Sequence, residues 1–164
     1  MQAPNLMIWI QITLVLVLIY LAYVDLTSFR LPNALTIPLI FSGLGFNFLA
    51  SQGFAEPFNA MLGYIFGYGF LWVMNFIYRI LKKHNGIGMG DAKLLAALGA
   101  WLGAGALPEI LLIASLTGLV GGFIWLKWHR SQISHAFPFG PFLAFAGIIE
   151  VLWPQALQTL LLIR

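Results

Sequence analysis

Two aspartates in this sequence are placed where a carboxyl group could do chemistry. Asp91 follows the alternating glycines of the segment 86–90 and directly precedes an apolar stretch that predicts a helix. Asp25 ends another long apolar stretch. Acids inside membrane segments are costly and usually functional. The structural alternative for Asp91 is an N-cap, because an aspartate at a helix start accepts hydrogen bonds from free backbone N–H groups.

Two carboxyl groups that lie close together do not both ionise easily and share one proton. The ionised group can then act as a general base on water, while the protonated group acts as a general acid toward a carbonyl. Asp25 and Asp91 are therefore candidates for hydrolysing a peptide bond without a metal ion or a covalent intermediate. A helix start favours a negative charge, which favours the ionised form of Asp91.

Other chemistries lack their residues. There is no cysteine, and the three histidines, His84, His129 and His135, do not have the spacing of metal ligands, so no metal or cofactor is expected. The phosphate-binding pattern G-x-x-x-x-G-K-[ST] is absent. The formal net charge of +3 does not require a nucleic-acid partner in a chain of this composition.

The composition is that of a membrane protein. Of 164 residues, 61% are hydrophobic and only 8% are charged, far from the average of soluble domains. Long uncharged runs predict transmembrane helices. We expect an all-α, polytopic membrane protein that forms a single domain over residues 1–164 in contact with lipid. About six transmembrane helices are predicted, near residues 6–24, 34–50, 58–79, 92–106, 109–127 and 137–153.

Basic residues predict the orientation of these helices. Most of them fall in three loops on one side of the membrane: Arg30, Arg79, Lys82, Lys83, Lys127 and Arg130. By the positive-inside rule these loops are cytoplasmic and the N-terminus is outside. Asp25 and Asp91 then lie at the cytoplasmic face. Trp101 is expected at the outer interface, as is Glu150, with a snorkelling or structural role.

The predicted fourth helix has two notable features. It is about 22 Å long at ~1.5 Å per residue, which is shorter than a hydrocarbon core of ~30 Å. The preceding glycines are therefore expected to dip into the membrane with Asp91. Its pair Gly99 and Gly103, like Gly63 and Gly67 on the third helix, predicts close helix packing.

Two segments of the sequence resemble the motifs of a known family. The segment from Asp25 to Leu31-Pro32-Asn33 resembles the first aspartate motif of bacterial type IV prepilin peptidases. The segment Gly88-Met89-Gly90-Asp91-Ala92-Lys93-Leu94 resembles their second motif, G-x-G-D-x-K-L, which relates them to other GxGD-type membrane aspartic peptidases. The segments 96–103 and 138–143 are also similar to the family, so the resemblance covers nearly the whole chain.

The resemblance implies an aspartic endopeptidase of the bacterial inner membrane with Asp25 and Asp91 as its catalytic pair. Its implied substrates are prepilins or pseudopilins of type IV pili or type II secretion, from which it removes a basic leader. Gly88, Gly90, Lys93, Pro32 and Asn33, which belong to the two motifs, are expected to shape the site or bind the substrate. Longer members also carry a cysteine-containing region and an N-methyltransferase activity; this chain resembles the short peptidase form, so that activity is not expected.

Two other functions fit part of the pattern. A proton- or cation-coupled transporter also uses paired intramembrane acids, but near the bilayer midplane rather than at its edge. A non-catalytic component of a pilus or secretion assembly would tolerate changes at Asp25.

Overall fold

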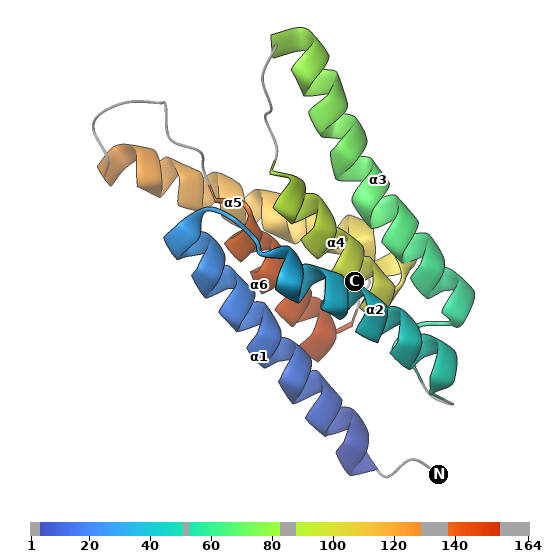
Figure 1. The fold of residues 1–164 in the computed structure, drawn as a ribbon. Helices are drawn as coiled ribbons and strands as arrows, with labels where there is room; N and C mark the ends of the chain where they lie inside the picture. The colour runs from blue at the N-terminus through green and yellow to red at the C-terminus, as the bar shows by residue number, and fades with distance from the viewer. Residues whose placement is uncertain (1–3, 51–52, 83–87, 129–137, 155–164) are drawn as a thin grey trace, which may run out of the picture.

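The computed structural model describes residues 4–50, 53–82, 88–128 and 138–154. These residues form helices joined by short connections, with no strand among them (Figure 1). The helices are α1 (Pro4–Ser28), α2 (Asn33–Leu49), α3 (Pro57–Lys82), α4 (Met89–Leu102), the 3₁₀ helix η1 (Ala104–Ala106), α5 (Leu107–Trp128) and α6 (Gly140–Leu152). The predicted all-α membrane fold is confirmed.

The helices differ in whether they are long enough to cross a bilayer. Three segments of the described chain are long and apolar enough by themselves: Leu6–Ser28, Pro57–Lys82 and Ala104–Ile124. The others are shorter, with 17 residues in α2, 14 in α4 and 13 in α6. The six predicted helices are therefore present, but only half of them have the length of a complete span.

α4 is the central helix of the fold. α2, α3 and α6 all pack against it, and from Ala92 to Trp101 every residue except Lys93 is buried. Small residues permit this crowding, as predicted. A Cβ on Gly63 of α3 would collide with the backbone carbonyl of Gly99, and one on Gly67 would lie 2.7 Å from the carbonyl oxygen of Leu95.

The ends of α4 differ from the prediction. The helix begins at Met89 and stops at Leu102, because Gly103 takes the left-handed value φ = 84° and a 3₁₀ turn follows. Gly88 occupies the N-cap position and Asp91 is the third helical residue. The N-cap alternative for Asp91 is therefore wrong, and its side chain is available for another role.

Two side chains predicted at the outer interface are buried. Trp101 is only 8% exposed, and its indole N–H donates to the carbonyl oxygen of Leu39 at 2.9 Å. Glu150 is 4% exposed within α6, so it does not snorkel. Neighbouring helices cover α4 and α6 as far as these residues, so the structural alternative for Glu150 holds. Their position at the outer interface stays a prediction.

Candidate active site

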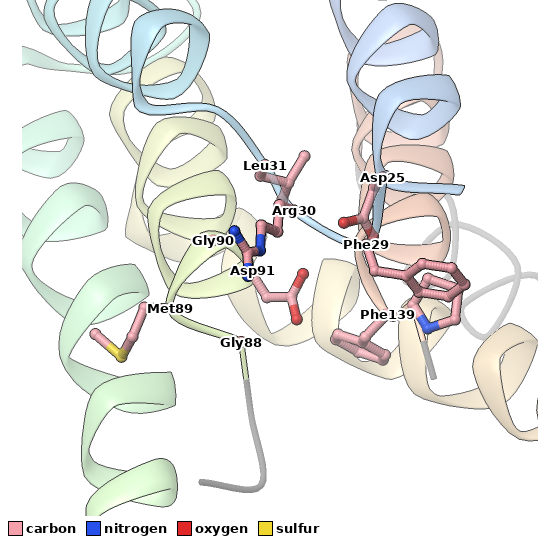
Figure 2. A pocket seen from close by; sticks show the side chains of 10 residues that line it. Asp25, Phe29, Arg30, Leu31, Gly88, Met89, Gly90, Asp91 and Phe139 are labelled. Carbon is pink, nitrogen blue, oxygen red and sulfur yellow. The ribbon is translucent and has the colours of Figure 1, made fainter. Parts of the chain in front are cut away.

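Asp25 lies one turn before the end of α1 and is 4% exposed. The chain leaves the helix at Phe29, whose backbone N–H donates to the carbonyl oxygen of Asp25 at 2.9 Å. Phe29 has φ = 52°, a left-handed conformation that is uncommon for an aromatic residue. This sharp exit turns the following residues, Arg30 and Leu31, toward α4 (Figure 2).

Asp91 is positioned by the first turn of α4. Its backbone N–H donates to the carbonyl oxygen of Gly88 at 3.1 Å, and its side chain is buried. The helix start favours the charged carboxylate. Burial nevertheless raises the pKa of Asp91 to about 7, with a further contribution from the charge of Asp25. The expected preference for the ionised form is outweighed, so the protonated form of Asp91 is populated at neutral pH.

The two carboxyl groups converge from separate helices (Figure 2). Their common neighbour is Gly140, the first residue of α6. A Cβ placed on Gly140 would lie 2.5 Å from Oδ2 of Asp25 and 3.3 Å from Oδ1 of Asp91. The sequence predicted that these aspartates meet, and the structure brings them to one point.

The aspartates share a cavity of about 320 Å³. Its walls are polar and apolar in nearly equal measure, and Arg30 is the cationic side chain among its described lining residues. The lining residues are Asp25, Phe29, Arg30, Leu31, Gly88, Met89, Gly90, Asp91, Pro138 and Phe139. Two buried acids that line a cavity of this size are the arrangement expected of a catalytic or binding site.

The two glycines of the second motif allow close approaches beside Asp91. A Cβ on Gly88 would lie 3.2 Å from Oδ2 of Asp91, and one on Gly90 would lie 2.9 Å from Cβ of Leu31. Gly88 therefore leaves room for the carboxyl group, and Gly90 lets the chain after α1 rest on α4. Both glycines line the cavity, as expected of residues that shape it.

Lys93, Pro32 and Asn33 lie outside the cavity lining. The Lys93 ammonium group donates to Oδ1 of Asn33 at 2.6 Å. Pro32 precedes α2 in an extended conformation, and its carbonyl oxygen accepts hydrogen bonds from the first turn of that helix. These residues therefore join α2 to α4 beside the site, and a direct contact with substrate stays a prediction.

No group of three or more potential metal ligands occurs among the described residues. His84, His129 and His135 lie outside the described residues.

Several lining residues were not singled out from the sequence. Phe29, Arg30, Leu31, Met89, Pro138 and Phe139 line the cavity, and Gly140 touches both acids. The first four lie within the two aspartate motifs, so their position in the sequence could have indicated that they line the site. For Gly140 the signal was a glycine between two prolines at a helix entry, which does not by itself indicate contact with either aspartate.

Comparison with known proteins agrees with the resemblance. The profile of the type IV leader peptidase family matches residues 12–123. A "Prepilin leader peptidase/N-methyltransferase" of Aeromonas hydrophila is 43% identical over 141 residues, covering 86% of this chain and 48% of the relative. Proteins of the same name from Dickeya chrysanthemi and Neisseria gonorrhoeae are each 42% identical, covering 80% of this chain and 46% and 44% of their own lengths.

The chain thus spans about half the length of the curated relatives it matches. No solved structure matches it. Because the family profile covers both aspartate motifs and most of the helices, the chain belongs to the type IV leader peptidase family.

Proposed function

We propose that this protein is a membrane aspartic endopeptidase that cleaves the basic leader peptide from type IV prepilins or pseudopilins. Asp25 and Asp91 are its catalytic pair, within a single membrane domain formed by residues 1–164. The proposal concerns peptidase activity alone. It is supported by the family to which the chain belongs and by the activity for which its relatives are named.

One observation carries the proposal. Two buried carboxyl groups, 66 positions apart in the sequence, converge on Gly140 beside a shared cavity. Burying acids is unfavourable unless their environment or function compensates. In a peptidase family, two acids beside a cavity are suited to activating water and polarising a peptide carbonyl.

The reaction follows from a pair that shares one proton. The ionised carboxylate takes a proton from a water molecule as the water oxygen attacks the carbonyl carbon of the scissile bond. The protonated carboxyl group gives its proton to the carbonyl oxygen, forming a tetrahedral diol. When the carbon–nitrogen bond breaks, the leaving nitrogen takes a proton from the pair, and one hydroxyl of the diol gives its proton to the other carboxylate as the carbonyl group of the product forms. The pair is then singly protonated again. Asp91, with a pKa of about 7, retains a proton for this cycle at neutral pH.

The orientation of the substrate follows from the proposed topology. The distribution of lysine and arginine supports an N-terminus outside the bacterial inner membrane and a site at its cytoplasmic face. A prepilin leader would then stay in the cytoplasm, while the apolar helix behind it packs among the membrane helices. The scissile bond would lie at the boundary, beside the ends of α1 and α4 that carry the acids.

A cleavage assay tests this function. The purified protein in detergent is incubated with a prepilin, and the products are identified by mass spectrometry. We expect one cut that separates the leader from the mature pilin, and no loss of activity on addition of a strong chelator. An intact prepilin, together with proton or cation flux in liposomes that depends on Asp91, would favour the transporter instead.

A further inference from the structure

α6 connects the two helices that carry the acids. Among the described helices, α1 makes its extensive contacts with α6, whereas α4 is packed by α2, α3 and α6 (Figure 1). The position of Asp25 relative to Asp91 therefore depends mainly on how α6 fits between α1 and α4. A small shift of α6 would change the separation of the two carboxyl groups.

The α4–α6 contact has a regular register. Gly140 on α6 lies against Asp91 on α4, and seven residues later a Cβ on Gly147 would lie 2.5 Å from Cδ2 of Leu98. Leu98 is likewise seven residues after Asp91. Because residues seven apart lie on nearly the same face of a helix, these two pairs belong to one parallel interface. α6 therefore contacts α4 at two points along its length. The contact of Gly140 with Asp91 lies at the site, and the contact of Gly147 with Leu98 lies two turns further along.

α6 also packs against α1, the helix that carries Asp25. Near the far end of α6, the side-chain amide of Gln11 lies 3.5 Å from the carbonyl oxygen of Val151. At the site, the backbone N–H of Gly140 faces the Asp25 carboxyl group. Oδ2 of Asp25 is buried and makes no hydrogen bond of ordinary geometry with any described residue. This oxygen is thus directed at the point where Gly140 and Asp91 meet.

We infer that Gly140 is a positioning residue of the peptidase, through which the first turn of α6 sets the separation and orientation of Asp25 and Asp91. A side chain here would occupy the space that the two carboxyl groups use. A glycine brings the backbone and its N–H group directly to Asp25. The inference rests on the proposed function, because the pair must be catalytic for its spacing to matter.

The test replaces Gly140 by alanine and measures peptidase kinetics at equal amounts of folded protein. The added methyl group would push Asp25 or α6 away, and misplacement by about 1 Å costs roughly 100-fold in rate. We expect kcat to fall by about that factor while KM changes little, since the pair acts in the transition state. Weaker coupling between the acids should also narrow the bell-shaped pH–rate profile by bringing its two limbs together.

The matched control is Gly45→Ala, because a Cβ at Gly45 has no neighbour within 4 Å. It should retain the kcat and the pH profile of the wild type. A folded Gly140→Ala protein with wild-type kcat and pH profile would overturn the inference. A loss of rate with an unchanged pH profile would also overturn it, because it indicates only a smaller active fraction. Failure of the proposed function is distinct, since the wild type itself would then not cleave prepilin.

A second pair of variants covers the case in which Gly140→Ala does not fold. Gly147→Ala places a methyl group against Leu98 and so displaces α6 from α4 without touching either acid. We expect a lower kcat and a narrowed pH profile, both restored when Leu98→Ala is added to make room. An unchanged pH profile in folded Gly147→Ala, or no restoration in the double variant, would contradict the role of α6 in spacing the acids.

Discussion

At the scale of single residues, Asp91 shows how two local effects compete. The start of α4 favours its charge, but burial and the nearby Asp25 raise its pKa to about 7. The glycines on either side of it have separate tasks: Gly88 leaves room for the carboxyl group, and Gly90 lets Leu31 approach α4. The chemistry of the acid therefore depends on two glycines, which carry no functional group, as well as on Asp25.

The raised pKa of Asp91 predicts a pH dependence of stability. As the pH rises from the ordinary value of 3.8 to about 7, the unfolded chain loses this proton while the folded chain keeps it. Stability contributed by the protonated form is therefore fully present below pH 4 and is lost through pH 7. We expect Asp91→Asn to be more stable relative to wild type at pH 8 than at pH 4, measured by thermal unfolding in detergent. An equal difference at the two pH values would contradict the shift.

Gly88→Ala should weaken cleavage because its methyl group would press on Oδ2 of Asp91. The neighbouring atoms need to yield by only a few tenths of an ångström. The expected loss in kcat is therefore about tenfold, below the roughly 100-fold that a 1 Å misplacement costs. Rates are compared at equal membrane levels, with Gly45→Ala as the control. Wild-type cleavage by Gly88→Ala would show that the carboxyl group tolerates the crowding.

At the scale of helices, α4 is fastened to α2 near both of its ends. The Lys93–Asn33 hydrogen bond lies beside the site. At the other end, the side-chain amide of Asn47 donates to the carbonyl oxygens of Ala100 and Trp101, each at 2.9 Å. These carbonyls end the helix and lack intrahelical partners. The pairings hold α4, and with it Asp91, in a fixed position along α2.

The α3–α4 crossing makes a separate prediction about stability. Gly63→Ala would force a methyl group into the backbone of Gly99, which has no flexible side chain to move aside. We expect a loss of roughly 1–3 kcal/mol, in the range of overpacked cores. Gly69→Ala on the same helix is the control, because a Cβ there has no neighbour within 4 Å. Equal unfolding midpoints for the two variants would rule out the tight crossing.

The sequence predicted much of this arrangement, and its failures have physical causes. Hydropathy located the helices, and the two motifs identified Asp25 and Asp91. The burial of Trp101 was not predicted because hydropathy does not reveal that neighbouring helices cover the end of α4. Gly140 was not recognised because its contact with both acids depends on how α6 packs between α1 and α4. The prolines on either side of Gly140 indicate a helix entry, but not which residues of other helices lie beside it.

At the scale of the whole molecule, the acids occupy one end of the bundle. α1 ends and α4 begins at the site, while Trp101 and Glu150 lie toward the opposite ends of their helices. This placement suits a peptidase whose substrate enters at a membrane boundary. It requires that the end bearing the acids faces the cytoplasm, which the basic loops predict.

Cysteine labelling tests that orientation in intact inner-membrane vesicles or spheroplasts. The chain has no native cysteine, so Lys82→Cys and Glu56→Cys give single labels at exposed positions at the two ends of α3. In spheroplasts, an impermeant thiol reagent should modify the cysteine at position 56 and leave the one at 82 unmodified until the membrane is opened. The reverse pattern would place the acids outside.

The most direct test of the account compares prepilin cleavage by Asp25→Asn and Asp91→Asn with cleavage by the wild type at equal membrane levels. Each asparagine preserves the size of the side chain but cannot exchange a proton, so each variant should lose cleavage by at least about 100-fold, as expected for a general acid or base. Glu150→Gln changes a buried acid in α6, away from the site. This variant should retain far more activity. Wild-type cleavage by either asparagine variant would contradict a catalytic pair.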